Sequence, residues 1–153
     1  MNLPDPVTWA IPLFGVFVVA EMLRARHDGF MVALINTAQL SPRVKQAHFA
    51  DANDWHANDA ETALMMHLHP EIVRPEKLDE ADDPDRTGGC VFSHPVNRTS
   101  LNGVTGQPSL ATKEKGQILY QWMQEDLLAI VQRATEEEAP LNHSYQNSIF
   151  ERL

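Results

Sequence analysis

The segment Asp54-Trp-His-Ala-Asn-Asp-Ala-Glu-Thr-Ala-Leu-Met-Met-His-Leu-His-Pro-Glu71 holds the densest group of chemically capable side chains in this sequence. Asn58 or Asp59 can begin a helix, because a short side-chain oxygen there accepts a hydrogen bond from a first-turn N–H group. Pro70 cannot continue a helix, since it lacks the backbone donor. The pattern therefore predicts a helix over residues 59–68.

Two side chains at the start of this helix can carry chemistry. His56 precedes the helix and Glu61 lies in its first turn. A histidine and a carboxylate across a loop-to-helix junction can converge on one point, where they bind a divalent metal or relay a proton. The alternative interpretation is structural. The helix dipole favours a carboxylate in the first turn, and a single histidine before a helix is typical of a surface or capping residue.

Two ordered segments of the sequence carry a family resemblance. His56-Ala-Asn-Asp-Ala-Glu-Thr-Ala-Leu-Met65 resembles the pattern His-Ala-Gly-Glu-x-Glu-Thr-Ser-Leu-Met, and Leu68–Val73 resembles Leu-x-Pro-Glu-Leu-Val. Gly103–Gly116 is similar to Gly-x-x-Gly-x-Pro-x-x-Ala-Thr-x-Glu-Lys-Gly. These patterns belong to the creatininase family of creatinine amidohydrolases and related formamide hydrolases. The resemblance extends over roughly residues 18–135, the C-terminal half of a family member.

The resemblance implies both a fold and an activity. The expected fold class is α/β, a creatininase-like three-layer α/β/α fold that is N-terminally truncated here. The expected activity is metal-dependent amidohydrolysis of a C–N bond in a cyclic amide or a formamide, with zinc or manganese as the divalent metal. Such a metal lowers the pKa of a bound water and polarises the amide carbonyl. The expected partners are a small-molecule amide substrate and further copies of the chain in a homo-oligomer.

The family's functional residues carry over by position. His56 matches the active-site histidine, a catalytic proton relay, and Glu61 matches a glutamate that binds the metal or supports a ligand. Trp55 can line a substrate pocket or pack against the protein. The resemblance assigns substrate binding to Trp55, Asn58, Gly103 and Gly106.

The sequence departs from the family upstream of these motifs. The family's Glu-x-His segment, a following Asp and an Asn-Gly-His-Gly-Gly-Asn loop do not occur, and Trp9–Gly15 stands at the place of that loop. A tight catalytic metal site normally needs three or more ligands, so His56 and Glu61 are too few. The sequence therefore predicts an incomplete hydrolase. The alternative is a non-catalytic remnant, an α/β module that acts only by association.

Composition limits the class of protein further. A chain of 153 residues predicts a single domain over residues 1–140, followed by a loose tail over 141–153. The net charge of −9 argues against nucleic acid and anionic membranes as partners. Cys90 is the only cysteine, which excludes an intramolecular disulfide and fits the reducing cytoplasm. Its thiol is either a nucleophile or a small buried side chain.

The rest of the chain predicts alternating elements. Ile11–Ala20 is apolar but too short to span a bilayer. A helix followed by a strand suggests α/β layers. The expected elements are helices over residues 13–27, 42–47 and 113–135, a buried strand over 30–35 and a short edge strand over 90–92.

Overall fold

The computed structural model divides the chain into two units, Met1–Ile35 and Asn36–Leu153. The structure describes residues 18–21, 23–24 and 33–139. In the first unit, residues 18–21 and 23–24 are helical. This agrees with the helix predicted over 13–27, whose other residues lie outside the described ones. The single domain predicted over 1–140 stays a prediction.

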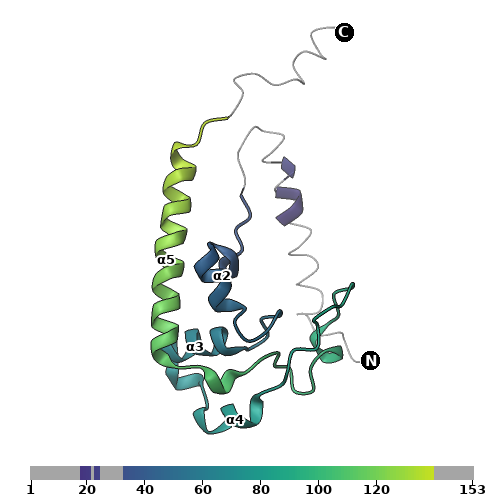
Figure 1. Ribbon diagram of the computed structural model, residues 1–153. Coiled ribbons are helices and arrows are strands. Elements are labelled where there is room, and N and C mark those ends of the chain that lie inside the picture. Colours follow the sequence, from purple (N-terminus) through teal and green to yellow (C-terminus); the bar gives the residue numbers. More distant parts are fainter. Residues whose placement is uncertain (1–17, 22, 25–32, 140–153) are drawn as a thin grey trace, which may run out of the picture. The chain divides into compact units, whose positions relative to one another are not determined.

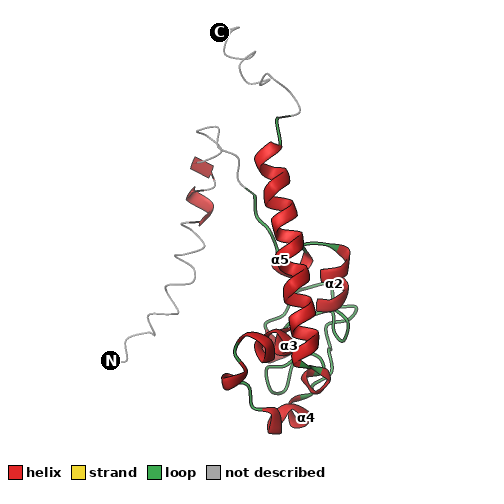
Figure 2. Cartoon of the chain, turned by 90° about the vertical axis from the view of Figure 1, so that its left-hand side faces the viewer, coloured by secondary structure: helices red, strands yellow, loops and turns green. Residues whose placement is uncertain are grey.

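Helices joined by long loops make up the described part of the second unit (Figures 1 and 2). The helices are α2 (Pro42–His48), α3 (Asp59–Leu68), α4 (Leu78–Ala81) and α5 (Lys113–Glu136). Short 3-10 turns occur at Thr37–Gln39, Pro70–Ile72, Pro75–Lys77, Val96–Arg98 and Pro108–Leu110. The predicted helices over 42–47, 59–68 and 113–135 are thus confirmed to within one residue. No helix among the described residues has the length and apolar character needed to cross a bilayer.

Both predicted strands are wrong where the structure describes them. Residues 33–35 of the strand predicted over 30–35 have no regular structure, and Leu34 is 86% exposed. Residues 90–92 form an exposed bend. A strand needs a neighbour to pair its backbone groups, and the described residues offer only an isolated antiparallel bridge between Asp83 and Gly106. The predicted α/β layering is therefore not seen in this part of the chain.

Side-chain oxygens cap the N-termini of the three longer helices, as the sequence pattern predicts for α3. The hydroxyl of Ser41 accepts a hydrogen bond from the Val44 N–H, and the hydroxyl of Thr112 accepts one from Lys115 N–H. Asn58 is the cap of α3, and its side-chain oxygen accepts from the Glu61 N–H. Each contact satisfies a donor that has no partner within its own helix, so local sequence sets where the helices start.

A small apolar core joins three helices. Val44 of α2, Ala60 of α3 and Leu119 of α5 are buried together. Partly buried side chains that pack around them are Leu40, Ala47, Leu64, Trp122 and Met123. On the outside, the Arg43 guanidinium forms ion pairs with Glu125 and Asp126 of α5 and lies over the Trp122 ring. Packing and charge together hold α2 against α5.

The helices α3 and α5 approach most closely at Gly116. Figure 1 shows α3 across the N-terminal part of α5. A Cβ atom added to Gly116 would lie 1.9 Å from the carbonyl oxygen of Ala63, well inside van der Waals contact. Only a residue without a side chain allows the two backbones to come this close.

His48 ends α2 as a buried histidine. It is 5% exposed, and neither ring nitrogen has a hydrogen-bond partner among the described residues. Burial lowers the pKa of the imidazole, because the charged form loses its hydration. The neutral ring is therefore the form that the fold accommodates.

We expect Gly116→Ala to destabilise the fold, because the added methyl group forces α3 and α5 apart. Overpacking of this kind costs about 1–3 kcal/mol, and helix propensity returns less than about 1 kcal/mol. Urea unfolding measures the loss. The exposed neighbour Gln117→Ala is the control and should change stability by less than about 0.5 kcal/mol. Equal stability of Gly116→Ala and the wild type would contradict the close approach.

We expect the protein to lose stability as the pH falls below about 6.5, the ordinary pKa of histidine. The pKa of His48 is lower in the folded state than in the unfolded state. Its contribution is therefore present above about pH 6.5 and is lost as the pH falls through the folded-state pKa. Urea unfolding at pH 7.5 and 5 measures the loss. His48→Phe should reduce this pH dependence, and an unchanged profile in that variant would assign it to another group.

Candidate functional site

His56 is held by its backbone against a distant loop. Its N–H donates to the hydroxyl oxygen of Thr105 over 3.2 Å, and its carbonyl accepts from the Thr105 N–H over 2.8 Å. Thr105 is fully buried, so this pair of contacts is sheltered from water. The backbone is thus fixed while the imidazole stays 44% exposed. This arrangement presents a reactive side chain from a rigid support.

Ala57, the next residue, has a backbone conformation that is unusual for a side-chain-bearing residue. Its φ angle is 51°, in the left-handed region, where L residues other than glycine are uncommon. The Glu61 carboxylate stabilises this turn by accepting the Ala57 N–H over 2.7 Å. The Thr62 hydroxyl donates to the Ala57 carbonyl over 3.2 Å. Such strain next to His56 is typical of functional sites.

The carboxylate of Asp51 joins the start of α3 to the loop before α5. One of its oxygens accepts the N–H groups of Asp59 over 3.0 Å and of Gln107 over 2.7 Å. The other accepts from the Asn58 amide over 3.2 Å. Gly106 leaves room for this carboxylate, since a Cβ there would lie 2.4 Å from an Asp51 oxygen. The φ angle of Gly106, 125°, also favours glycine.

A buried carboxylate, that of Asp83, fixes the other side of the loop. The Arg86 guanidinium, 2.7 Å away, and the Leu101 N–H hold the pKa of Asp83 well below its usual range. The backbones of Asp83 and Gly106 exchange hydrogen bonds of 3.1 and 2.7 Å. Gly103, in contrast, is exposed with a φ angle of 95°, which suits a turn. The loop that carries Thr105 is therefore anchored from both Asp51 and Asp83.

A polar pocket of about 320 Å³ opens beside His56. Asp54 lies next to the imidazole, with 3.6 Å between its carboxylate oxygen and His56 Nε2. The same oxygen accepts the Trp55 N–H over 2.9 Å, which holds the carboxylate in place. The pocket is lined by Asn53, Asp54, His56, Thr87, Cys90, Val91, Phe92, Ser93 and His94. This pocket is the candidate functional site.

The predicted site residues do not all converge on this pocket. His56 lines it, but Glu61 lines a separate, largely apolar pocket with Leu64 and Leu68. Trp55 packs against Phe49 with 5.6 Å between ring centroids and the ring planes tilted by 54°, and it is 39% exposed. Asn58 is fully buried, where it caps α3. These placements favour structural roles for Trp55 and Asn58, and the substrate-binding assignments, with those of Gly103 and Gly106, stay predictions.

Several residues of the pocket and its supports were not predicted as part of the site. Thr105 lies within the Gly103–Gly116 motif and Asp54 opens the segment before His56, but neither was assigned a role. Asp51 and His94 lie outside both motifs. Cys90 is exposed, so the prediction of a small buried thiol is wrong. Its role as a nucleophile stays a prediction. The sequence signal for Asp51 and Asp54 was limited to their place in a polar segment just before His56.

The described residues do not form a ligand set for a metal. Within 18–21, 23–24 and 33–139, no three His, Cys, Asp or Glu side chains lie close enough together to hold an ion. The Glu61 carboxylate is already engaged by the Ala57 N–H. The catalytic role of His56 and the metal-binding role of Glu61 stay predictions.

Several solved structures have a similar fold. A protein from Bacteroides fragilis NCTC 9343 assigned as a creatinine amidohydrolase is 24% identical with a TM-score of 0.61, and covers 79% of this chain and 49% of its own. A mutant creatininase of the Zn-Zn type and the manganese form of creatininase are each 22% identical with a TM-score of 0.59. Each covers 76% of this chain and 49% of its own.

The family assignment rests on a match along most of the chain. No curated protein sequence matches at a significant level. The chain spans about half the length of the similar solved structures. The family model described as creatinine amidohydrolase matches residues 16–131, which include both sequence motifs and the pocket beside His56. The chain belongs to the creatininase family.

Proposed function

We propose that this chain contributes the residues that transfer protons in a creatininase-type amidohydrolase. The reaction is hydrolysis of a C–N bond in a small cyclic amide or formamide. The observation that supports it is the placement of His56, whose backbone is fixed on buried Thr105 while its imidazole faces a polar pocket. A rigid support with an accessible imidazole is what general acid–base catalysis requires. Free Cys90 fits a reducing compartment, and we propose the cytoplasm.

In this proposal His56 moves the proton that hydrolysis must transfer. Attack of water on the carbonyl carbon releases a proton, and the leaving nitrogen must receive one before the C–N bond breaks. The imidazole can accept the first and donate the second. The Asp54 carboxylate, 3.6 Å from Nε2, stabilises the imidazolium between these two steps. The fixed backbone of His56 keeps the ring at the pocket during both transfers.

Zinc or manganese is the cofactor proposed for the whole enzyme, as in the similar structures of Zn-Zn and manganese types. Such an ion supplies Lewis acidity to the carbonyl and an activated water. We assign no ligand to the described residues, because Glu61 is turned to the Ala57 N–H and no three suitable side chains cluster within the described ranges. The proposal for this chain is therefore limited to His56 and Asp54.

We expect His56→Ala to abolish most amide hydrolysis. Turnover of creatinine and of formamide is measured in the presence of zinc and then of manganese. Loss of a general acid–base group lowers kcat by about 100-fold or more. His69→Ala is the matched control, because His69 is an exposed histidine that pairs with Glu71 away from the pocket. Absence of turnover in the wild type with either metal, or equal activity of His56→Ala, would contradict the proposal.

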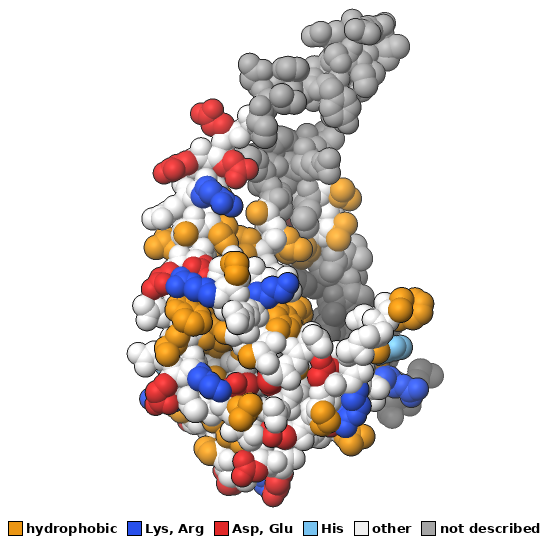
Figure 3. Space-filling view, viewed as in Figure 1, with side chains coloured by type: hydrophobic (Ala, Val, Ile, Leu, Met, Phe, Trp, Pro, Cys, Tyr) orange, Lys and Arg blue, Asp and Glu red, His pale blue; other side chains and the backbone are white. Residues whose placement is uncertain are grey.

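The second candidate function is association without catalysis, and the surface of α5 favours it. Apolar side chains are exposed along this helix between charged ones (Figure 3). The exposed apolar residues that share one face of the helix are Leu127, Leu128 and Val131. Monomeric proteins rarely leave contiguous apolar patches bare. We propose that this face mediates a homo-oligomer, which is compatible with either function.

We expect a double substitution, Leu128→Glu with Val131→Glu, to weaken self-association, because it places charge in the apolar face. Sedimentation velocity over a range of concentrations measures the change. Ala129→Glu, at an exposed position of the same helix about 100° or more around its axis from Leu128 and Val131, controls for added charge and should leave association unchanged. A monomeric wild type at every concentration would exclude this surface as a homo-oligomer interface.

A further inference from the structure

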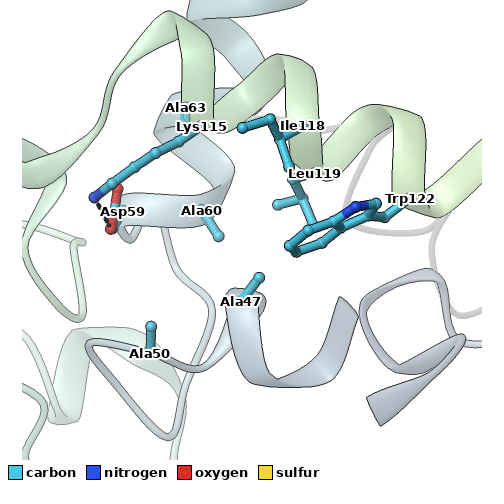
Figure 4. Close-up of a pocket in the computed structure, with 9 residues that line it drawn as sticks. All are labelled: Ala47, Ala50, Asp59, Ala60, Ala63, Lys115, Ile118, Leu119 and Trp122. Carbon is cyan, nitrogen blue, oxygen red and sulfur yellow. Dashed lines mark hydrogen bonds and ion pairs between the residues drawn. The ribbon is translucent and has the colours of Figure 1, made fainter. Parts of the chain in front are cut away.

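Another pocket lies between α2, α3 and α5, apart from the pockets lined by His56 and by Glu61. Its volume is about 300 Å³, at the lower end of the range for small-molecule sites. Four alanines leave the space open, and larger apolar side chains close it from α5. The lining residues are Ala47, Ala50, Asp59, Ala60, Ala63, Lys115, Ile118, Leu119 and Trp122 (Figure 4).

A charged pair interrupts this apolar lining at one end. Figure 4 shows Asp59 and Lys115 together, away from Trp122. The ammonium of Lys115 donates to Asp59 Oδ2 over 2.8 Å and to the Leu110 carbonyl over 2.7 Å. The pair is electrically neutral as a whole, so the pocket does not select a charged molecule. An uncharged ligand with an apolar body matches both its walls and its net charge.

The second carboxylate oxygen of Asp59 determines which polar group a ligand of this pocket needs. Asp59 is 8% exposed, and its Oδ1 has no hydrogen-bond partner among the described residues. A buried carboxylate oxygen without a donor is costly. Asp59 lines the pocket, and the χ2 torsion of aspartate is broad, so rotation of the carboxylate, with the flexible Lys115 side chain following it, can present Oδ1 to a ligand. A ligand with one O–H group satisfies it.

We infer that this pocket binds a small neutral molecule with an apolar body and one hydroxyl donor, such as a phenol or a short alcohol. The hydroxyl donates to Asp59, and the apolar part packs on Leu119, Trp122 and the alanines. The pocket is separate from His56 and the inference does not depend on hydrolysis. The binding should therefore persist unchanged in the His56→Ala chain.

The test compares phenol with toluene, which has nearly the same shape but no donor. Titration of the full chain, followed by backbone amide NMR, measures each dissociation constant. Phenol should shift the amide signals of Ala60, Ala63 and Leu119, and toluene should bind about tenfold more weakly because the hydrogen bond to a charged acceptor is missing. Equal binding of the two probes, or no binding of phenol, would overturn the inference.

A pocket-filling variant locates the binding. Ala47→Leu occupies the space and should weaken phenol binding about tenfold or more, without the loss of folding that a change at Asp59 risks. Ala129→Leu, at an exposed position of α5, is the matched control and should bind phenol as the wild type does. Thermal unfolding establishes that both variants are folded. Unchanged phenol affinity in folded Ala47→Leu would place the binding elsewhere and overturn the assignment.

Discussion

The carboxylate of Asp51 stands where the two family motifs meet. It accepts the N–H groups of Asp59 and Gln107 and the side-chain amide of Asn58. Charge-assisted hydrogen bonds of this kind are stronger than neutral ones, and they fix the start of α3 relative to the loop that carries Thr105. The position of His56 follows from that arrangement, because its backbone is bonded to Thr105 on both sides. Gly106 is part of the same arrangement, because any side chain at this position would occupy the space of the Asp51 carboxylate.

The pocket beside His56 and the pocket over Asp59 differ in chemistry because different elements build them. The pocket beside His56 is formed by loops, whose polar side chains stay near water. The pocket over Asp59 is formed mainly by helix faces, whose alanines and larger side chains give it a largely apolar lining. Placing both within one small helical unit separates a reactive imidazole from an apolar binding volume. The charged residue Asp59, one position after the Asn58 cap, is the point at which the two regions come close in the chain.

Local chemistry in the sequence predicted the helices well. Ser41, Asn58 and Thr112 each satisfy a first-turn N–H group a few residues away, and this information lies within a short window. The strand predictions failed because the pairing of strands is not local. An apolar run such as 30–35 becomes a strand only beside a partner strand. The site was predicted only in part for the same reason. The spacing of His56 and Glu61 suggested convergence, but Glu61 bonds the Ala57 N–H, and Asp51 reaches residues some fifty positions away.

The close contact of Gly116 with Ala63 has a consequence for the order in which this protein folds. The helix α3 has ten residues, and isolated helices shorter than about 12–15 residues are marginal in water. Its partner surface on α5 is synthesised roughly fifty residues later. During translation the motif around His56 therefore leaves the ribosome without the helix that stabilises it. The contact between Gly116 and Ala63 can form only after the chain has been made at least through Gly116, so α3 gains its packing partner well after its own synthesis.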